Sequence, residues 1–141
     1  MSVESEALEW LKNSLYMNIR GIGPNVYAYS VDYLTEDLMP ALTITLDSVE
    51  ATEASTATKN IKRATFSVGI HVVNKSAFWS IKLLCDIREM VTQTLEAMET
   101  PSSVIDFKEE GAGAFEANQE LQFPIVSQSI TYSFLLSEVD Y

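Results

Sequence analysis

The sequence is poor in the residues that mark several common classes of protein. It has one cysteine, Cys85, and one histidine, His71, among 141 residues. A single cysteine excludes an internal disulfide and fits a reducing compartment. The sequence has no apolar run near the roughly 20 residues of a membrane span, and residues 1–6 lack the positive charge of a secretory signal. We therefore expect neither a disulfide scaffold nor a membrane protein.

Basic residues are also scarce, with nine Lys and Arg against 20 Asp and Glu and a formal net charge of −11. Nucleic-acid binding depends on Lys and Arg that neutralise phosphates, so this balance opposes general affinity for DNA. Residues 59–88 hold six basic and one acidic side chain, a net charge of +5, whereas the segments on either side are strongly acidic. This basic segment either contacts an acidic surface of a neighbouring copy or is a solvated patch.

The clearest pattern in the sequence is a strand that runs directly into a helix. Residues 64–73 alternate, with Phe66, Val68 and Ile70 on one side and polar or small residues on the other. From residue 74 the period becomes helical and lasts until Pro101. At ~1.5 Å per residue, a helix over residues 76–98 would be ~34 Å long, enough to cross a whole sheet. Its apolar residues are expected near one face: Phe78, Ile81, Leu84, Cys85, Val91, Leu95 and Met98.

Weaker signals complete the expected order of elements. Residues 3–18 predict a first helix, capped by Ser2 and ended by Gly21, Gly23 and Pro24. Short or alternating apolar stretches predict strands at 26–30, 42–49, 104–107 and 122–136. Residues 50–60 and 108–119 are polar and lack a period, so we expect mobile loops there.

These elements predict one α+β domain over residues 1–141. Its centre would be a mixed, mostly antiparallel β-sheet, with the N-terminal helix and one long central helix packed on one face. The other faces of the three best strands carry hydroxyls, on Thr43, Thr45, Thr65, Ser67, Ser129, Thr131 and Ser133. We expect that face to be wet, or to line a polar and neutral lumen or interface.

The sequence offers no recognisable catalytic or metal-binding constellation. His71 has no second His or Cys nearby, whereas zinc needs about four N or S ligands, so we expect a surface or hydrogen-bonded histidine. Cys85 lies in mid-helix on the apolar stripe, where a buried and inert thiol is expected. Acidic clusters at 32–37 and 106–110 lack EF-hand spacing, and the apolar side of the sheet shows no converging polar groups. We therefore expect no catalytic residue, cofactor or metal.

Five stretches, in their order along the chain, carry a resemblance to a known family. They are the opening helix (7–15), P-A-L-T-I-T-L-D (40–47), K-R-A-T-F-S-V-G-I-H-V-V (62–73), the long helix (77–98) and S-I-T-Y-S-F-L-L (129–136). In this order they resemble the tail terminator and tail completion proteins of long-tailed bacteriophages, also called tail-to-head joining or neck proteins. One departure from the family is the long, acidic loop before the last strand.

The resemblance implies a non-enzymatic virion structural protein that forms a homo-oligomeric ring, commonly a hexamer. Such a ring caps the tail tube protein and joins it to head–tail connector and neck proteins, while DNA passes through without sequence-specific binding. The protein would assemble in the host cytoplasm and reside in the tail or neck of the virion. The two loops and the basic segment would make the contacts. The expected interface residues are Glu50, Glu53, Lys59, Lys62, Arg63, Glu109, Glu110, Phe115 and Glu116.

Three alternatives stay open. A baseplate or tube adaptor of the injection machinery would share the same pattern. A small α+β ligand-binding module would need polar groups that converge on a pocket between sheet and helix. A metal-dependent hydrolase would need its acidic loops to bind a metal ion, which elemental analysis of the purified protein would detect.

Overall fold

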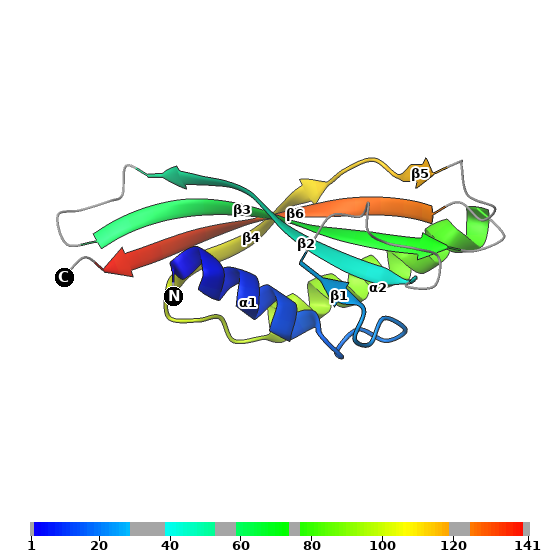
Figure 1. Ribbon diagram of the computed structural model, residues 1–141, viewed down its shortest axis with the longest axis horizontal. Coiled ribbons are helices and arrows are strands. Elements are labelled where there is room, and N and C mark those ends of the chain that lie inside the picture. Colours follow the sequence, from blue (N-terminus) through cyan, green and yellow to red (C-terminus); the bar gives the residue numbers. More distant parts are fainter. Residues whose placement is uncertain (1, 29–38, 53–58, 74–76, 119–124, 140–141) are drawn as a thin grey trace.

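A computed structural model describes residues 2–28, 39–52, 59–73, 77–118 and 125–139 of the chain (Figure 1). The helices and strands in these ranges are α1 (Val3–Leu15), β1 (Val26–Tyr27), β2 (Ala41–Ala51), β3 (Lys59–Val73), α2 (Ala77–Ala97), β4 (Val104–Ala112), β5 (Glu116–Asn118) and β6 (Ile125–Val139). The predicted α+β class, with a mixed and mostly antiparallel sheet, is confirmed.

The sheet is long and strongly twisted, and its strands cross near the middle of Figure 1. Its order is β1-β2-β3-β6-β4, and the short strand β5 also pairs with β6. β1 is parallel to β2, and the other pairings are antiparallel. β3 and β6 pair along their whole length, from Lys59 opposite Val139 to Val73 opposite Ile125. These two strands therefore form the spine to which the other elements attach.

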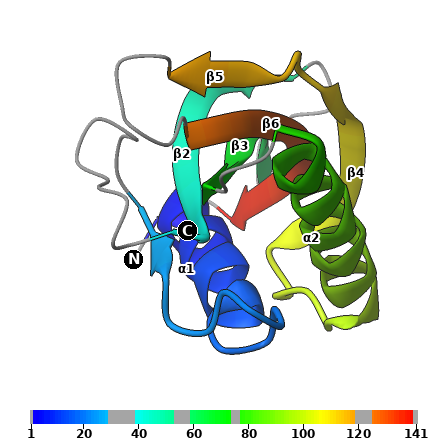
Figure 2. The same ribbon diagram turned by 90° about the vertical axis from the view of Figure 1, so that its right-hand side faces the viewer.

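Both helices lie on the same side of the sheet, as Figures 1 and 2 show from two directions. They cover the apolar side of β3, whose alternating residues are fully buried: Ala64, Phe66, Val68, Ile70 and Val72. Burying a large apolar side chain stabilises the fold by roughly 1.5–3 kcal/mol. The predicted alternation and the placement of both helices on one face are thus confirmed.

α1 begins as its sequence predicts. The Ser2 hydroxyl accepts a hydrogen bond from the Ser5 N–H at 3.1 Å, and Glu4 and Glu6 lie in the first turn. The helix ends at Leu15, earlier than the expected residue 18, because Tyr16 is extended and Met17 has a positive φ of 62°. The Met17 N–H donates to the Gly23 carbonyl at 2.9 Å, which closes a turn in place of a further helical turn.

An aromatic cluster joins α1 to the far edge of the sheet. Trp10 contacts Phe107 and Phe134 edge-on, with ring centroids 5.5 and 5.8 Å apart. Phe107 of β4 also stacks on Tyr132 of β6, at 5.3 Å. The Trp10 indole N–H donates to the Glu99 carbonyl at 2.9 Å. Trp10 is therefore a core residue that fixes the segment between α2 and β4.

The prediction of which α2 residues are buried is partly wrong. Leu84, Val91 and Leu95 are buried, but the side chains of Phe78, Ile81 and Cys85 are exposed. Each helical residue turns about 100° from the last, so positions 78, 81 and 85 form a second stripe beside the one at 84, 91 and 95. A helix that lies on a sheet buries one stripe, so the expected buried thiol of Cys85 is instead at the surface.

The two expected loops contain strands. β4 continues through Ala112, and β5 occupies Glu116–Asn118, so the loop predicted at 108–119 is wrong. β2 extends to Ala51 and β3 begins at Lys59, which shortens the loop predicted at 50–60; its residues 53–58, with Glu53, lie outside the described residues. Pairing along the long β3 and β6 strands overrides the weak strand propensity of these charged and glycine-containing segments.

Candidate functional surfaces

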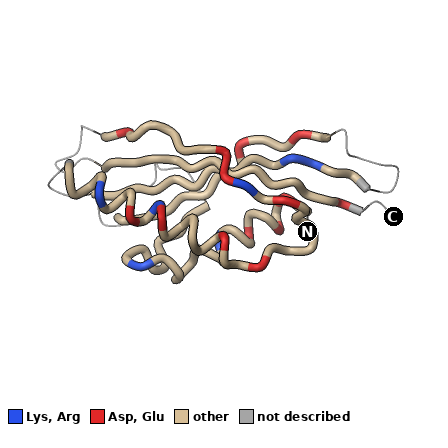
Figure 3. Tube along the Cα trace, turned by 180° about the vertical axis from the view of Figure 1, so that it is seen from behind, with Lys and Arg blue, Asp and Glu red and all other residues tan. Residues whose placement is uncertain are grey.

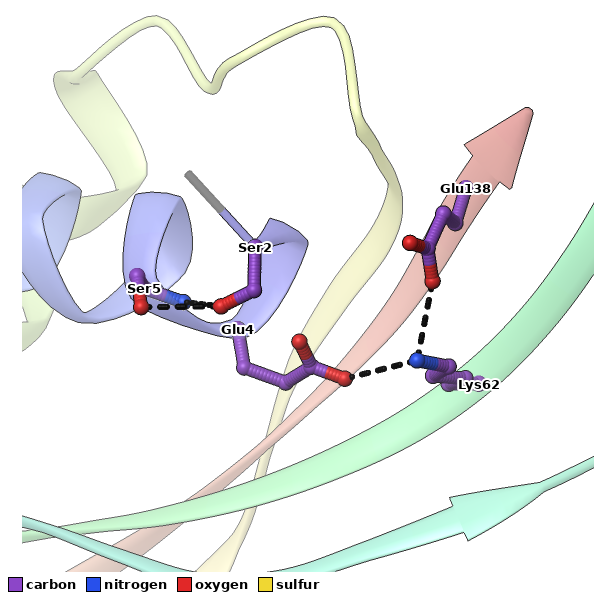
Figure 4. Close-up of polar contacts among 5 residues, drawn as sticks. All are labelled: Ser2, Glu4, Ser5, Lys62 and Glu138. Atoms are coloured by element: carbon purple, nitrogen blue, oxygen red, sulfur yellow. Dashed lines mark hydrogen bonds and ion pairs between the residues drawn. The ribbon is translucent and has the colours of Figure 1, made fainter. Parts of the chain in front are cut away.

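Lys62 is engaged inside the molecule. Its Nζ lies 2.9 Å from Oε2 of Glu138 and 3.1 Å from Oε1 of Glu4 (Figure 4). These hydrogen bonds, to Glu138 first and then to Glu4, raise the pKa of Lys62. The network ties the first turn of α1 to β3 and β6. Lys62, predicted to contact a neighbouring copy, is therefore already paired within its own chain.

The other expected interface residues that the structure describes fall into two groups, one on β2 and β3 and one in or between β4 and β5, on the far side of β6. Glu50 and Arg63 lie opposite each other in the β2–β3 ladder, and both are exposed. Glu109, Glu110, Phe115 and Glu116 are exposed in or between β4 and β5, beyond β6, and Glu110 pairs with Lys108 at 3.5 Å. Lys59 pairs through its backbone with Val139. The structure thus separates the expected interface into two groups.

The largest exposed apolar side chains of α2 gather in its first two turns. We call Phe78, Trp79, Ile81, Lys82 and Cys85 the α2 patch. Phe78 is 68 % exposed, Trp79 54 % and Ile81 42 %. The rings of Phe78 and Trp79 meet edge-on at 5.5 Å, and the Lys82 ammonium lies 5.7 Å from the centre of the Trp79 ring. Contiguous exposed apolar groups of this kind mark interaction surfaces.

A second exposed segment is the far half of β2, residues 46–51, which we call the β2 arm. Every residue of the arm is exposed, with Leu46 at 44 % and Val49 at 42 %. β1 pairs with β2 only at Leu42 and Thr43, so the described residues place no strand beside the outer edge of the arm. Asp47 and Glu50 give the arm a negative charge. Open strand edges are surfaces on which another chain can pair.

The hydroxyl-bearing face of the sheet is wet only in part. His71 is 4 % exposed, and hydrogen bonds join its Nε2 to the Thr43 hydroxyl at 2.8 Å and its Nδ1 to the Ser127 hydroxyl at 2.7 Å. The expectation of a hydrogen-bonded histidine is confirmed. Burial lowers the pKa of His71 to about 4, so the ring is neutral near pH 7. A Cβ at Gly69 would lie 2.5 Å from the Thr43 hydroxyl oxygen, so only glycine fits beside this bond.

Further along the same face the polar groups are exposed. The Asp47 carboxylate accepts hydrogen bonds from the hydroxyls of Thr45 and Ser67. Figure 3 shows acidic positions along the whole length of the molecule, including its middle, and fewer basic ones. The face therefore presents hydroxyls and carboxylates, with Arg63 of β3 as an exposed basic residue.

A pocket of about 420 Å³ lies between α2 and β4. Leu95, Phe107 and Tyr132 contribute apolar surface to its lining, and Thr92, Glu96 and Glu109 contribute polar groups, among others. Burial raises the pKa of Tyr132 to about 12, so its phenol keeps its proton near neutral pH. Polar groups that converge on an apolar pocket were not found in the sequence, because residues 92–109 and 132 meet only in the folded chain.

Neither the scan of family models nor the search of curated proteins finds a match to this chain. In the part of the chain that the structure describes, no three or more His, Cys, Asp or Glu side chains are grouped so as to hold a metal ion. Neither described helix is both long and apolar enough to cross a membrane.

Proposed function

We propose that this protein is a non-enzymatic virion structural protein, a ring-forming tail terminator or neck component that caps the tail tube and joins it to the head connector. The proposal begins from the resemblance of the sequence to that family. It is supported by the order of the elements, in which α1, β2, β3, α2 and β6 occupy the five stretches that carry the resemblance.

The observation that carries the proposal is a pair of complementary surfaces at opposite ends of the molecule. The α2 patch lies at one end of the long axis in Figure 1, and the β2 arm lies at the other. Each presents exposed apolar side chains, Trp79 and its neighbours on the patch and Val49 with Leu46 on the arm. Lys82 adds a positive charge to the patch but pairs with the exposed Asp86 beside it, at 3.5 Å, whereas the arm carries Asp47 and Glu50. The two surfaces can therefore meet mainly through apolar contact, and Lys82 can exchange its exposed partner for a carboxylate of the arm.

A contact between two different surfaces of the same chain is heterologous. Repeated from copy to copy, it generates a ring when the rotation closes and a filament when it does not. The hydroxyl-bearing face of the sheet suits the inside of such a ring, since a surface with few Lys and Arg holds DNA weakly and lets it pass.

Light scattering over a concentration series, followed by negative-stain microscopy, tests this proposal. We expect a species of several subunits with ring-shaped views. The double variant Phe78→Ser, Trp79→Ser should shift the protein toward the monomer, because it removes the apolar part of the patch. Tyr16→Ser is the matched control, since Tyr16 is also exposed, at 47 %, but lies outside both surfaces and is not an expected interface residue. A monomer at every concentration would instead favour the adaptor or ligand-binding alternative.

A further inference from the structure

The pocket between α2 and β4 has the dimensions and walls of a ligand site. Its volume of about 420 Å³ lies within the usual range for pockets that hold small molecules. One wall is the C-terminal half of α2, and the other is formed by residues 104–109 of β4. Leu95 is 2 % exposed and Tyr132 1 % exposed, so this part of the lining belongs to the core and is held rigidly.

The Tyr132 hydroxyl is buried without a hydrogen-bond partner among the residues that the structure describes. Thr92, which also lines the pocket, stands near enough to oppose the rise in the pKa of Tyr132 but does not meet the geometry of a hydrogen bond. A buried polar group normally has a partner, and one without it calls for an explanation. A ligand in the pocket would supply that partner.

The charges around the pocket define the ligand. Glu96, Asp106 and Glu109 line it with one cation, Lys108, and a second cation, Arg88, lies near Tyr132 outside the lining. Lys108 is turned to Glu110, with which it pairs at 3.5 Å, so the carboxylates of the pocket are left in excess. Aromatic faces also attract cations, and Phe107 stacks on Tyr132 at 5.3 Å in the lining.

We propose that the pocket between α2 and β4 binds a small organic cation with an apolar body. The body packs on Leu95, Phe107 and Tyr132, and the charged end lies among Glu96, Asp106 and Glu109. The Tyr132 oxygen accepts a hydrogen bond from the N–H of the ligand. This site does not depend on the proposed ring, because it uses neither the Phe78–Trp79 pair nor the β2 arm.

Titration with three probes, followed by ligand-observed NMR, tests the proposal. 2-Phenylethylammonium has both features, 3-phenylpropionate has the same body with the opposite charge, and methylammonium lacks the body. We expect saturable binding of 2-phenylethylammonium, at least about tenfold tighter than that of either other probe. Equal binding of the two phenyl compounds would overturn the requirement for a cation, and no saturable binding of 2-phenylethylammonium would overturn the site.

Two variants locate the binding. Tyr132→Phe removes only the unpartnered oxygen and should weaken binding of 2-phenylethylammonium about tenfold, the usual effect of one hydrogen bond to a charged group. Glu109→Gln removes one exposed carboxylate of the pocket and should weaken binding without any effect on folding. Glu116→Gln is the matched control, because Glu116 is an exposed carboxylate that does not line the pocket. Equal losses in Glu109→Gln and Glu116→Gln would indicate attraction to the net charge and contradict the proposal, and unchanged affinity in Tyr132→Phe would contradict the hydrogen bond. Light scattering on the same samples measures the oligomeric state, so a loss of ligand binding can be told apart from a loss of ring formation.

Discussion

Replacement of the buried His71 by glutamine should remove a large part of the pH dependence of stability. Burial holds the pKa of His71 at about 4 in the folded protein, against about 6.5 in the unfolded chain. The unfolded chain therefore takes up this proton first as the pH falls. The stability that neutral His71 contributes is fully present above about pH 6.5 and is lost progressively as the pH falls toward 4.

The linkage between the two pKa values gives the size of the effect. Between about pH 7.5 and about pH 5, the free energy of unfolding should fall by about 2 kcal/mol more in the wild type than in His71→Gln. This window stays above the pI of about 4.3, where precipitation would interfere. The many carboxylates affect both proteins alike, so the difference between them isolates the histidine.

Urea unfolding followed by tryptophan fluorescence, at half-unit steps of pH, measures this difference. NMR titration of the ring protons of His71 measures its folded pKa directly. Parallel loss of stability in the two proteins, or a folded pKa near 6.5, would refute the account of a buried, neutral histidine bridged by Thr43 and Ser127.

Three further predictions concern single residues. Lys62→Met should lower the free energy of unfolding in urea by about 1 kcal/mol, because it leaves the mostly buried Glu4 without its cation. Lys82→Met removes one partner of an exposed pair and should lower it by less than about 0.5 kcal/mol. Equal losses in the two variants would contradict the role given to the Lys62 network. Gly69→Ala should destabilise the protein by about 1–3 kcal/mol in thermal melts, because its Cβ would lie 2.5 Å from the Thr43 oxygen. Gly113→Ala is the control and should be nearly neutral, because the nearest atom to its Cβ would be 3.8 Å away. Cys85 should react rapidly with a thiol reagent in the monomer and slowly in the assembly, and a slow reaction in both would contradict its exposure.

The strands with strong local signals could be predicted from the sequence. The alternation around Phe66 and Ile70 fixes which side of β3 is buried, and Ser2 with Glu4 marks the start of α1. Each signal depends only on residues that are close together in the sequence, so the rest of the fold does not alter it. The class of fold followed from these elements because a half-apolar sheet and two amphipathic helices have few ways to bury their apolar sides.

The α2 patch, the β2 arm and the pocket could not be predicted, because they depend on how the helices and strands pack together. Phe78 and Leu84 are both apolar residues of one helix, and only the sheet decides which stripe is buried. The charged β4 has little strand propensity of its own and forms a strand because β6 offers an edge. Tyr132 and Thr92 lie 40 residues apart by their numbers and meet in a pocket only after α2 and β4 are in place.

The β2 arm and the α2 patch can be tested together with one added cysteine. Cys85 is the single cysteine of the chain and belongs to the α2 patch, so Val49→Cys places a second thiol on the opposite end of the molecule. The two thiols are too far apart to bond within one copy, but a head-to-tail contact would bring them together between copies. Two controls are Val49→Cys with Cys85→Ser, which can form dimers at most, and Ser102→Cys, at an exposed site off both surfaces.

Mild oxidation followed by non-reducing gel electrophoresis is the measurement that tests the central claim most directly. The head-to-tail ring predicts a ladder of covalent multimers for Val49→Cys that ends at a closed species, and no such ladder for either control. Monomers and dimers alone, at concentrations where the wild type assembles, would show that the two ends of the molecule do not meet and would contradict the proposed ring.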